Sequence, residues 1–150
     1  MRSVAMVRRG LLAVLLVIAV LPAVASAASR SELSIVHAIN HARARHHLPG
    51  LRLNRALARA AEAHSSEMAR SGLMSHGAFE QRLRSYIHSR DVGENIAWMR
   101  RCNARRVVSM WMHSAPHRAV MLSRQFRKVG VGRRSSSDIC FVTADFASAR

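Results

Sequence analysis

Apolar residues recur at helical spacing over the first two thirds of the chain. Leu33, Val36 and Ile39 are three residues apart, which predicts a helix over residues 31–47. Pro49-Gly50 follows directly and is expected to end this helix.

A second helix is predicted after Asn54, whose side chain can cap the helix start. Its apolar stripe follows the spacing i, i+3, i+4, i+7 and i+11, and Gly72 is expected to end it. The inner positions are Leu57, Ala60, Ala61, His64 and Met68. Residues 79–86 are expected to form a short helix after a loop.

Asn103 can cap a further helix. We expect Pro116 to end it, because the residue before a proline avoids the α region. The expected inner positions are Val107, Met110, Trp111 and Ser114, and one more helical turn is expected to contain His117, Val120 and Met121.

The spacing of the apolar residues changes from helical to alternating after this turn. Residues 128–133 and 139–146 alternate Val and Phe with smaller residues and are typical of strands. A third strand is expected near residues 95–99. Helices followed by strands predict a layered α+β fold and not alternating βαβ units.

The first 27 residues have the pattern of a secretory signal. Arginines precede an apolar run over residues 11–21, and Ala25-Ser26-Ala27 matches a cleavage site. We expect a signal peptide at 1–27 and a single domain at 28–150. The alternative is an uncleaved anchor, although the run is shorter than the ~20 residues of a membrane span.

The chain is strongly basic, with 24 Lys and Arg against 8 Asp and Glu and a net charge of +16. This charge suggests anionic partners such as a cell-wall polymer. Alternatively it reflects an Arg-rich, Ala-rich composition. One Tyr and four Phe offer no aromatic platform for bases, so specific nucleic-acid binding is not expected.

The two cysteines, Cys102 and Cys140, are expected to form one disulfide in an exported protein. Two buried free thiols are the alternative.

A few polar residues occupy positions where the pattern favours apolar ones. They are His64, His76, Glu94, Ser114 and His117. Buried polar groups need partners, so side chains that converge inward predict a binding site or a shared hydrogen-bond network.

Four segments, in their order and spacing, resemble the secreted CAP superfamily, which includes the cysteine-rich secretory proteins, antigen 5 and plant pathogenesis-related proteins of group 1. The segments are "SHGAFEQRL", "VGENIAW", "VVSMWMHSAPHRAVML" and "FRKVGVG" with "FVTADF". The resemblance is greatest to the compact bacterial members. It implies a three-layer α-β-α sandwich with a small central antiparallel sheet.

The resemblance also implies a cleft that often binds zinc or another divalent metal. His76 of "SHG" and His117 match the two family histidines, and Glu94 of "GEN" matches the first acid. Asn95, the amide beside Glu94, is placed in the same cleft. The second acid of the family pattern W-x-x-E is absent, and Ser114 stands in its place.

Several residues have simpler interpretations. Glu94 would only hold its loop through backbone amides, and His64 would be a packed helix histidine near the cleft. His37 and His41 have metal-binding spacing but, beside Arg43 and Arg45, are expected on a solvated face.

Three function classes follow for this protein, which we expect to be exported and monomeric. The first is binding of a divalent metal or a small apolar, lipid-like or sterol-like ligand, for which methionines could line a groove. The second is hydrolysis. Either a bound metal would activate water, or Ser114 would act as the nucleophile with a histidine as its base. The third is attachment to an anionic wall surface. No H-E-x-x-H helix of a zinc protease is present, and enzymatic activity is not expected.

Overall fold

The computed structural model describes residues 29–149, and the signal peptide predicted at 1–27 lies outside them. Five helices and four strands form within this range. In chain order they are α1 (Arg30–Arg45), β1 (Arg52–Leu53), α2 (Arg55–Ser71), α3 (Phe79–Tyr86), β2 (Val92–Arg100), α4 (Ala104–His113), α5 (Ala115–Met121), β3 (Phe126–Ser136) and β4 (Ile139–Ser148).

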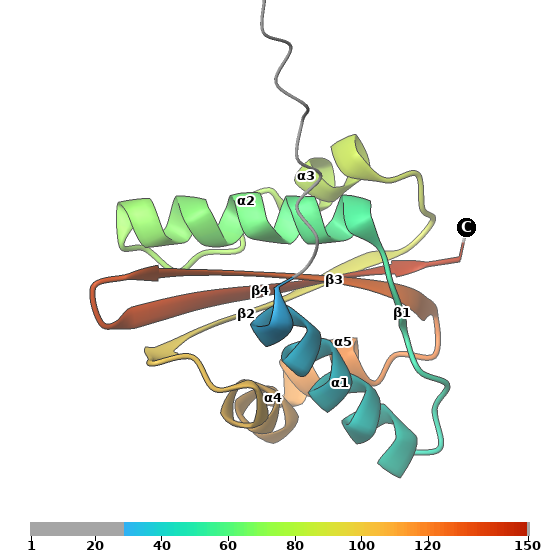
Figure 1. Ribbon diagram of the computed structural model, residues 1–150. Coiled ribbons are helices and arrows are strands. Elements are labelled where there is room, and N and C mark those ends of the chain that lie inside the picture. Colours follow the sequence, from blue (N-terminus) through green and yellow to red (C-terminus); the bar gives the residue numbers. More distant parts are fainter. Residues whose placement is uncertain (1–28, 150) are drawn as a thin grey trace, which may run out of the picture.

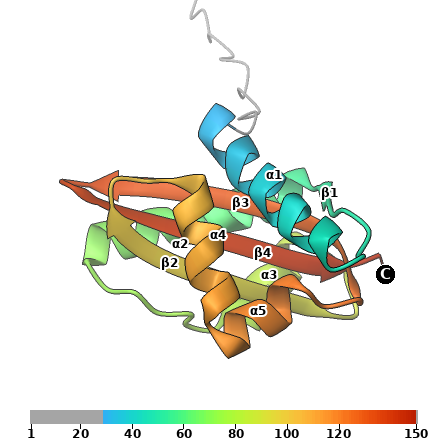
Figure 2. The same ribbon diagram turned by 90° about the horizontal axis from the view of Figure 1, so that it is seen from below.

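The elements stack in three layers, as Figure 1 shows. α2 and α3 cover one face of the sheet, and α1, α4 and α5 cover the other (Figure 2). The predicted α-β-α sandwich is therefore confirmed. None of the helices in the described residues is long and apolar enough to cross a membrane.

The strand order in the sheet is β1-β3-β4-β2, so β2 lies at an edge. β3 and β4 form an antiparallel hairpin, and β2 pairs antiparallel with β4. The short strand β1 was not predicted and pairs parallel with β3, which makes the sheet mixed. Two residues are too few to show a period, so this strand has no sequence signal.

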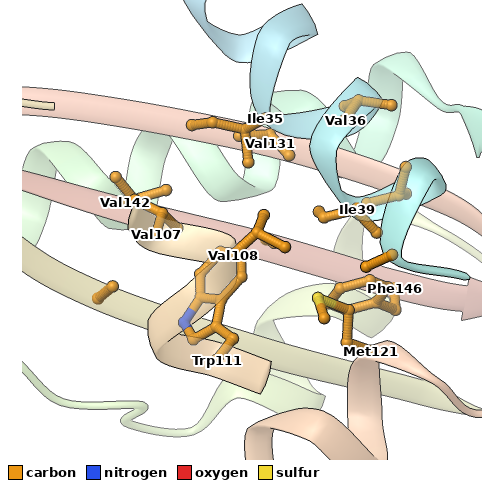
Figure 3. Close-up of a cluster of buried hydrophobic side chains, with 14 of the residues drawn as sticks. Ile35, Val36, Ile39, Val107, Val108, Trp111, Met121, Val131, Val142 and Phe146 are labelled. Atoms are coloured by element: carbon orange, nitrogen blue, oxygen red, sulfur yellow. The ribbon is translucent and has the colours of Figure 1, made fainter. Parts of the chain in front are cut away.

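The larger apolar core lies between the sheet and the α1, α4 and α5 layer (Figure 3). Trp111 is buried there, and its indole N–H donates to the carbonyl of Ile96 at 2.9 Å. Met110 was expected beside it but is 43% exposed, whereas Val108 is buried. α4 is therefore rotated slightly from the predicted orientation.

On the other face, α2 lies very close to β3 because two glycines of that strand have no side chain. A Cβ atom on Gly130 would collide with the backbone of Leu57 and Ala58, and one on Gly132 with that of Ala61 and Glu62. The glycines therefore set the distance between the sheet and α2, the helix that carries His64.

The predicted helix signals are largely confirmed. Asn54 and Asn103 cap α2 and α4, accepting hydrogen bonds from Leu57 N and Arg106 N at 3.0 Å. Gly72 ends α2 in the left-handed conformation.

α4 ends before Pro116 and a further helical segment contains His117, Val120 and Met121, as predicted, but Ala115 before the proline is already helical. The last residue of α4 is His113; Ser114 after it is extended and only half-buried, and Pro116 lies in the first turn of α5. Pro116 therefore begins a helix, because its fixed φ and missing N–H are tolerated in a first turn.

Arg43 was expected on a solvated face but is fully buried. Its guanidinium donates to the carbonyls of Pro49, Met121 and Ser123 at 2.8–3.0 Å, so it joins the end of α1 to the end of α5. Burial, and to a smaller extent the charge of Arg127, lowers its pKa.

The predicted disulfide between Cys102 and Cys140 is present, with Cα atoms 5.5 Å apart. It ties the segment before α4 to the start of β4, so the two cysteines are not free thiols.

Candidate functional site

The candidate site lies at the outer edge of β2. The loop between α2 and α3 brings His76 to this edge, and α5 brings His117 to it from the opposite helical layer. Their ring centroids are 6.4 Å apart, with 29° between the ring planes. Glu94 and Asn95 lie in β2 and point to opposite layers, as neighbours in a strand do.

Glu94 is fully buried in its side chain and has two partners. Its Oε1 is 2.8 Å from Nδ1 of His76, and its Oε2 accepts a hydrogen bond from Arg82 of α3. These are side-chain partners, and no bond from a backbone amide to the carboxylate is found in the described residues. The interpretation in which Glu94 only holds its loop through amides is therefore not supported.

His117 is held by two contacts. Its Nδ1 lies 2.8 Å from Oγ of Ser114, and its carbonyl accepts a hydrogen bond from Nδ2 of Asn95 at 2.9 Å. Partial burial, and then the nearby charge of His76, lowers the pKa of His117. A lowered pKa favours the neutral imidazole at pH 7, which is the form that binds metals.

His64 lies in α2 and contacts the loop that carries His76. It is buried, with Nε2 2.8 Å from the carbonyl of Ser75 and Nδ1 3.3 Å from Glu67. Its Nε2 is 3.9 Å from Glu94. The bond to Ser75 fixes the residue next to His76, so His64 positions the loop, which fits the simpler interpretation of a packed histidine.

Arg82 and Asp145 also belong to the site, although neither was predicted from the sequence. Asp145 of β4 is the direct neighbour of Glu94 in the β2–β4 pairing, and its side chain is fully buried. Nη2 of Arg82 lies 4.0 Å from its Oδ1. Neither oxygen of Asp145 has a hydrogen-bond partner among the described residues.

Burial raises the pKa of Asp145 well above its ordinary value, and the charge of Glu94 raises it further, whereas Arg82 lowers it. Two carboxyl groups sharing one arginine favour a state in which one of them keeps a proton. The available sequence signal was an acid inside the alternating run of residues 141–146.

The sequence profile of the cysteine-rich secretory protein (CAP) family matches residues 36–146. The chain belongs to the CAP family. No curated protein matches the chain.

Solved structures agree with CAP membership. An outer surface protein from Borrelia burgdorferi has a TM-score of 0.73 and 20% identity, covering 83% of this chain and 97% of that one. An extracellular SCP-domain protein from Bacillus anthracis has a TM-score of 0.67 and 29% identity, covering 79% of this chain. This chain spans 40% of that longer protein.

NaASP2, solved with Zn²⁺, has a TM-score of 0.59 and 12% identity, covering 79% of this chain and 80% of that one. NaASP2 and the Borrelia protein are only 12% and 20% identical to this chain, so their similarity shows the CAP fold alone.

The two imidazoles of His76 and His117 are the side chains of this site that could reach a metal ion together. Glu94 is not free for this purpose, because its oxygens bond His76 and Arg82. Within residues 29–149, no group of three His, Cys, Asp or Glu side chains is arranged to hold a metal. A metal ion held here would have two protein ligands, fewer than the three of a typical catalytic zinc site, and water or a ligand would fill its other positions.

Proposed function

We propose that this is an extracellular CAP-domain protein whose site at the edge of β2 binds one divalent metal ion, with zinc the first candidate. The ligands would be Nε2 of His76 and Nε2 of His117. The supporting observation is that both rings make their hydrogen bond through Nδ1, to Glu94 and to Ser114. Metal-binding histidines typically use the second ring nitrogen in this way, which fixes the ring and its tautomer.

Each neighbouring residue has a role in this proposal. Glu94 would accept a hydrogen bond from Nδ1–H of His76, and Ser114 would orient His117 in the same way. Asn95 holds the backbone of His117 through its amide. A bound zinc ion would supply a Lewis acid that can activate water. Metal-dependent hydrolysis is therefore an activity to be tested once binding is established.

Isothermal titration of zinc into the metal-stripped protein tests this function. We expect micromolar or tighter binding that is lost in His76→Ala/His117→Ala. A matched control is His37→Ala/His41→Ala, which removes two exposed histidines of α1. Absence of binding in the unmodified protein, or an equal loss in both variants, would contradict the proposal.

The orienting residues offer a finer test. Ser114→Ala and Glu94→Gln should each weaken zinc binding about 10- to 100-fold, the usual effect of losing such a partner. Unchanged affinity in both variants would show that the Nδ1 bonds do not prepare the histidines for metal.

A second candidate function is binding of a small apolar ligand. A pocket of about 590 Å³ lies beside the cleft, lined by Met68, Leu73 and Ala78 together with His64 and Arg82. Leu73 is 70% exposed, so its side chain is accessible to a ligand. Mass spectrometry of the purified protein should detect a retained lipid, and Leu73→Ser should reduce its amount.

A further inference from the structure

Four arginines gather where β2 runs into α4. Arg100 ends β2 and Arg101 follows it, whereas Arg105 and Arg106 lie in the first turn of α4. All four are exposed and line a depression of about 580 Å³. A positive charge of this density in a concave surface is suited to an anion.

The backbone around these arginines is held in place. Cys102 is tied to Cys140, and the N–H of Arg101 donates to the carbonyl of Asp138 at 3.2 Å. Asn103 caps α4 by accepting from the N–H of Arg106. The backbone positions from which the four side chains extend are therefore fixed before any partner binds, which lowers part of the entropic cost of binding.

Local electrostatics make this arrangement unfavourable without a partner. The start of a helix carries a partial positive charge and favours acidic residues, yet the first turn of α4 contains none and has two arginines. Of these four arginines, only Arg100 has an ion-pair partner among the described residues, Asp138 at 3.7 Å, and both side chains are 80% exposed. A bound anion would relieve this repulsion.

The basic surface continues along α4. A second depression of about 820 Å³ lies between α1 and α4, which run side by side in Figure 2, and it shares Asn103, Arg105 and Ser109 with the first. Its lining adds Arg45 and three histidines, His37, His41 and His113. Neither depression is lined by an Asp or a Glu.

We propose that these two depressions, here named the α4 groove, bind a linear polymer with repeating phosphate groups, such as a phosphodiester polymer of a cell wall. Arginine suits phosphate because its planar fork can donate two parallel hydrogen bonds. The charges extend along a helix, which fits a chain of anionic groups better than a single ion. The α4 groove shares no residue with the metal cleft, so this proposal is independent of the proposed metal function.

Other anionic macromolecules fit the α4 groove less well. Its lining has no Phe, Tyr or Trp on which nucleic-acid bases could stack. A membrane-binding surface usually combines basic residues with Trp, Phe or Leu that enter the lipid, and the lining contains none of these.

The test is titration of the purified protein with long-chain inorganic polyphosphate. The groove variant is Arg101→Gln/Arg105→Gln/Arg106→Gln. The control variant is Arg55→Gln/Arg59→Gln/Arg70→Gln on α2, which removes the same charge from the opposite layer. We expect the groove variant to bind about tenfold or more weakly, because charge-assisted hydrogen bonds are lost, and the control to change by less than about threefold.

The outcomes separate specific from general attraction. Equal weakening in both variants would mean that net charge alone drives binding, and this would overturn the proposal, as would an absence of binding. Anionic phospholipid vesicles and single-stranded DNA serve as competing probes. If either binds the groove arginines more tightly than polyphosphate does, the assignment of the polymer is wrong. Circular dichroism of each variant confirms that its fold is retained.

Discussion

Replacement of Glu94 by Gln should lower the free energy of unfolding by only about 2 kcal/mol. Removing one partner of a buried ion pair ordinarily costs about 3–5 kcal/mol, because the remaining charge is left uncompensated. Here a second acid, Asp145, lies 4.0 Å from the same arginine, Arg82. Because the charge of Glu94 helps to raise the pKa of Asp145, its removal lets Asp145 ionise and replace it.

The double variant removes this replacement. Glu94→Gln/Asp145→Asn leaves Arg82 without either acid and should cost about 4 kcal/mol. Asp145→Asn alone should be close to neutral at pH 7, because an amide replaces a carboxyl group that is costly to ionise there. The two substitutions should therefore be non-additive by about 2 kcal/mol, as expected for residues in contact.

The pH dependence of stability gives an independent test of the protonated state of Asp145. Between the ordinary aspartate pKa of about 3.9 and the raised pKa of the folded state, folded Asp145 keeps a proton that the unfolded chain releases. The contribution of this group therefore falls as pH rises through that range, and Asp145→Asn should remove this fall. Urea unfolding of the four proteins measures both effects. Additivity within about 0.5 kcal/mol would refute the idea that the acids share Arg82.

Three further predictions concern the scaffold. Gly130→Ala should lower the free energy of unfolding by about 3 kcal/mol, because its methyl group would overlap α2. Gly50→Ala, whose methyl group would lie 3.5 Å from its nearest neighbour, should change the free energy of unfolding by less than about 1 kcal/mol. Similar losses in both variants would contradict the close approach of α2 to Gly130. Cys102→Ser/Cys140→Ser should cost about 4 kcal/mol in urea unfolding through the loop that the disulfide closes, and a loss below about 1 kcal/mol would be inconsistent with this. Arg43→Met should cost about 3 kcal/mol by calorimetry, because three backbone carbonyls lose their donor; an unchanged protein would show that those bonds contribute nothing net.

Local signals in the sequence were sufficient for most of the helices. Asn54, Gly72 and Asn103 act through neighbours within four residues, and such contacts leave a recognisable pattern. Arg43 could not be placed from its neighbours, because its partners include carbonyls 78 and 80 residues away. The same holds for β1, which exists only through its pairing with β3.

The candidate site was predictable to a similar extent. The order of motifs indicated His76, Glu94 and His117, and the structure brings these residues to one edge. Their metal-binding role stays a prediction. Asp145 was missed because its relation to Glu94 depends on the register between β2 and β4, which single-sequence patterns do not give.

The position of the cleft at a sheet edge also bears on self-association. A nine-residue strand such as β2 that lacks a neighbour on one side can pair with the same strand of another molecule, which leads to aggregation. α3 and α5 contact this strand; His76 lies in the loop before α3 and His117 lies in α5, so the elements that carry the site also restrict access to the edge. Loosening of α3 or α5 would therefore expose the edge of β2 to strand addition, and the protein would lose solubility as well as its binding site.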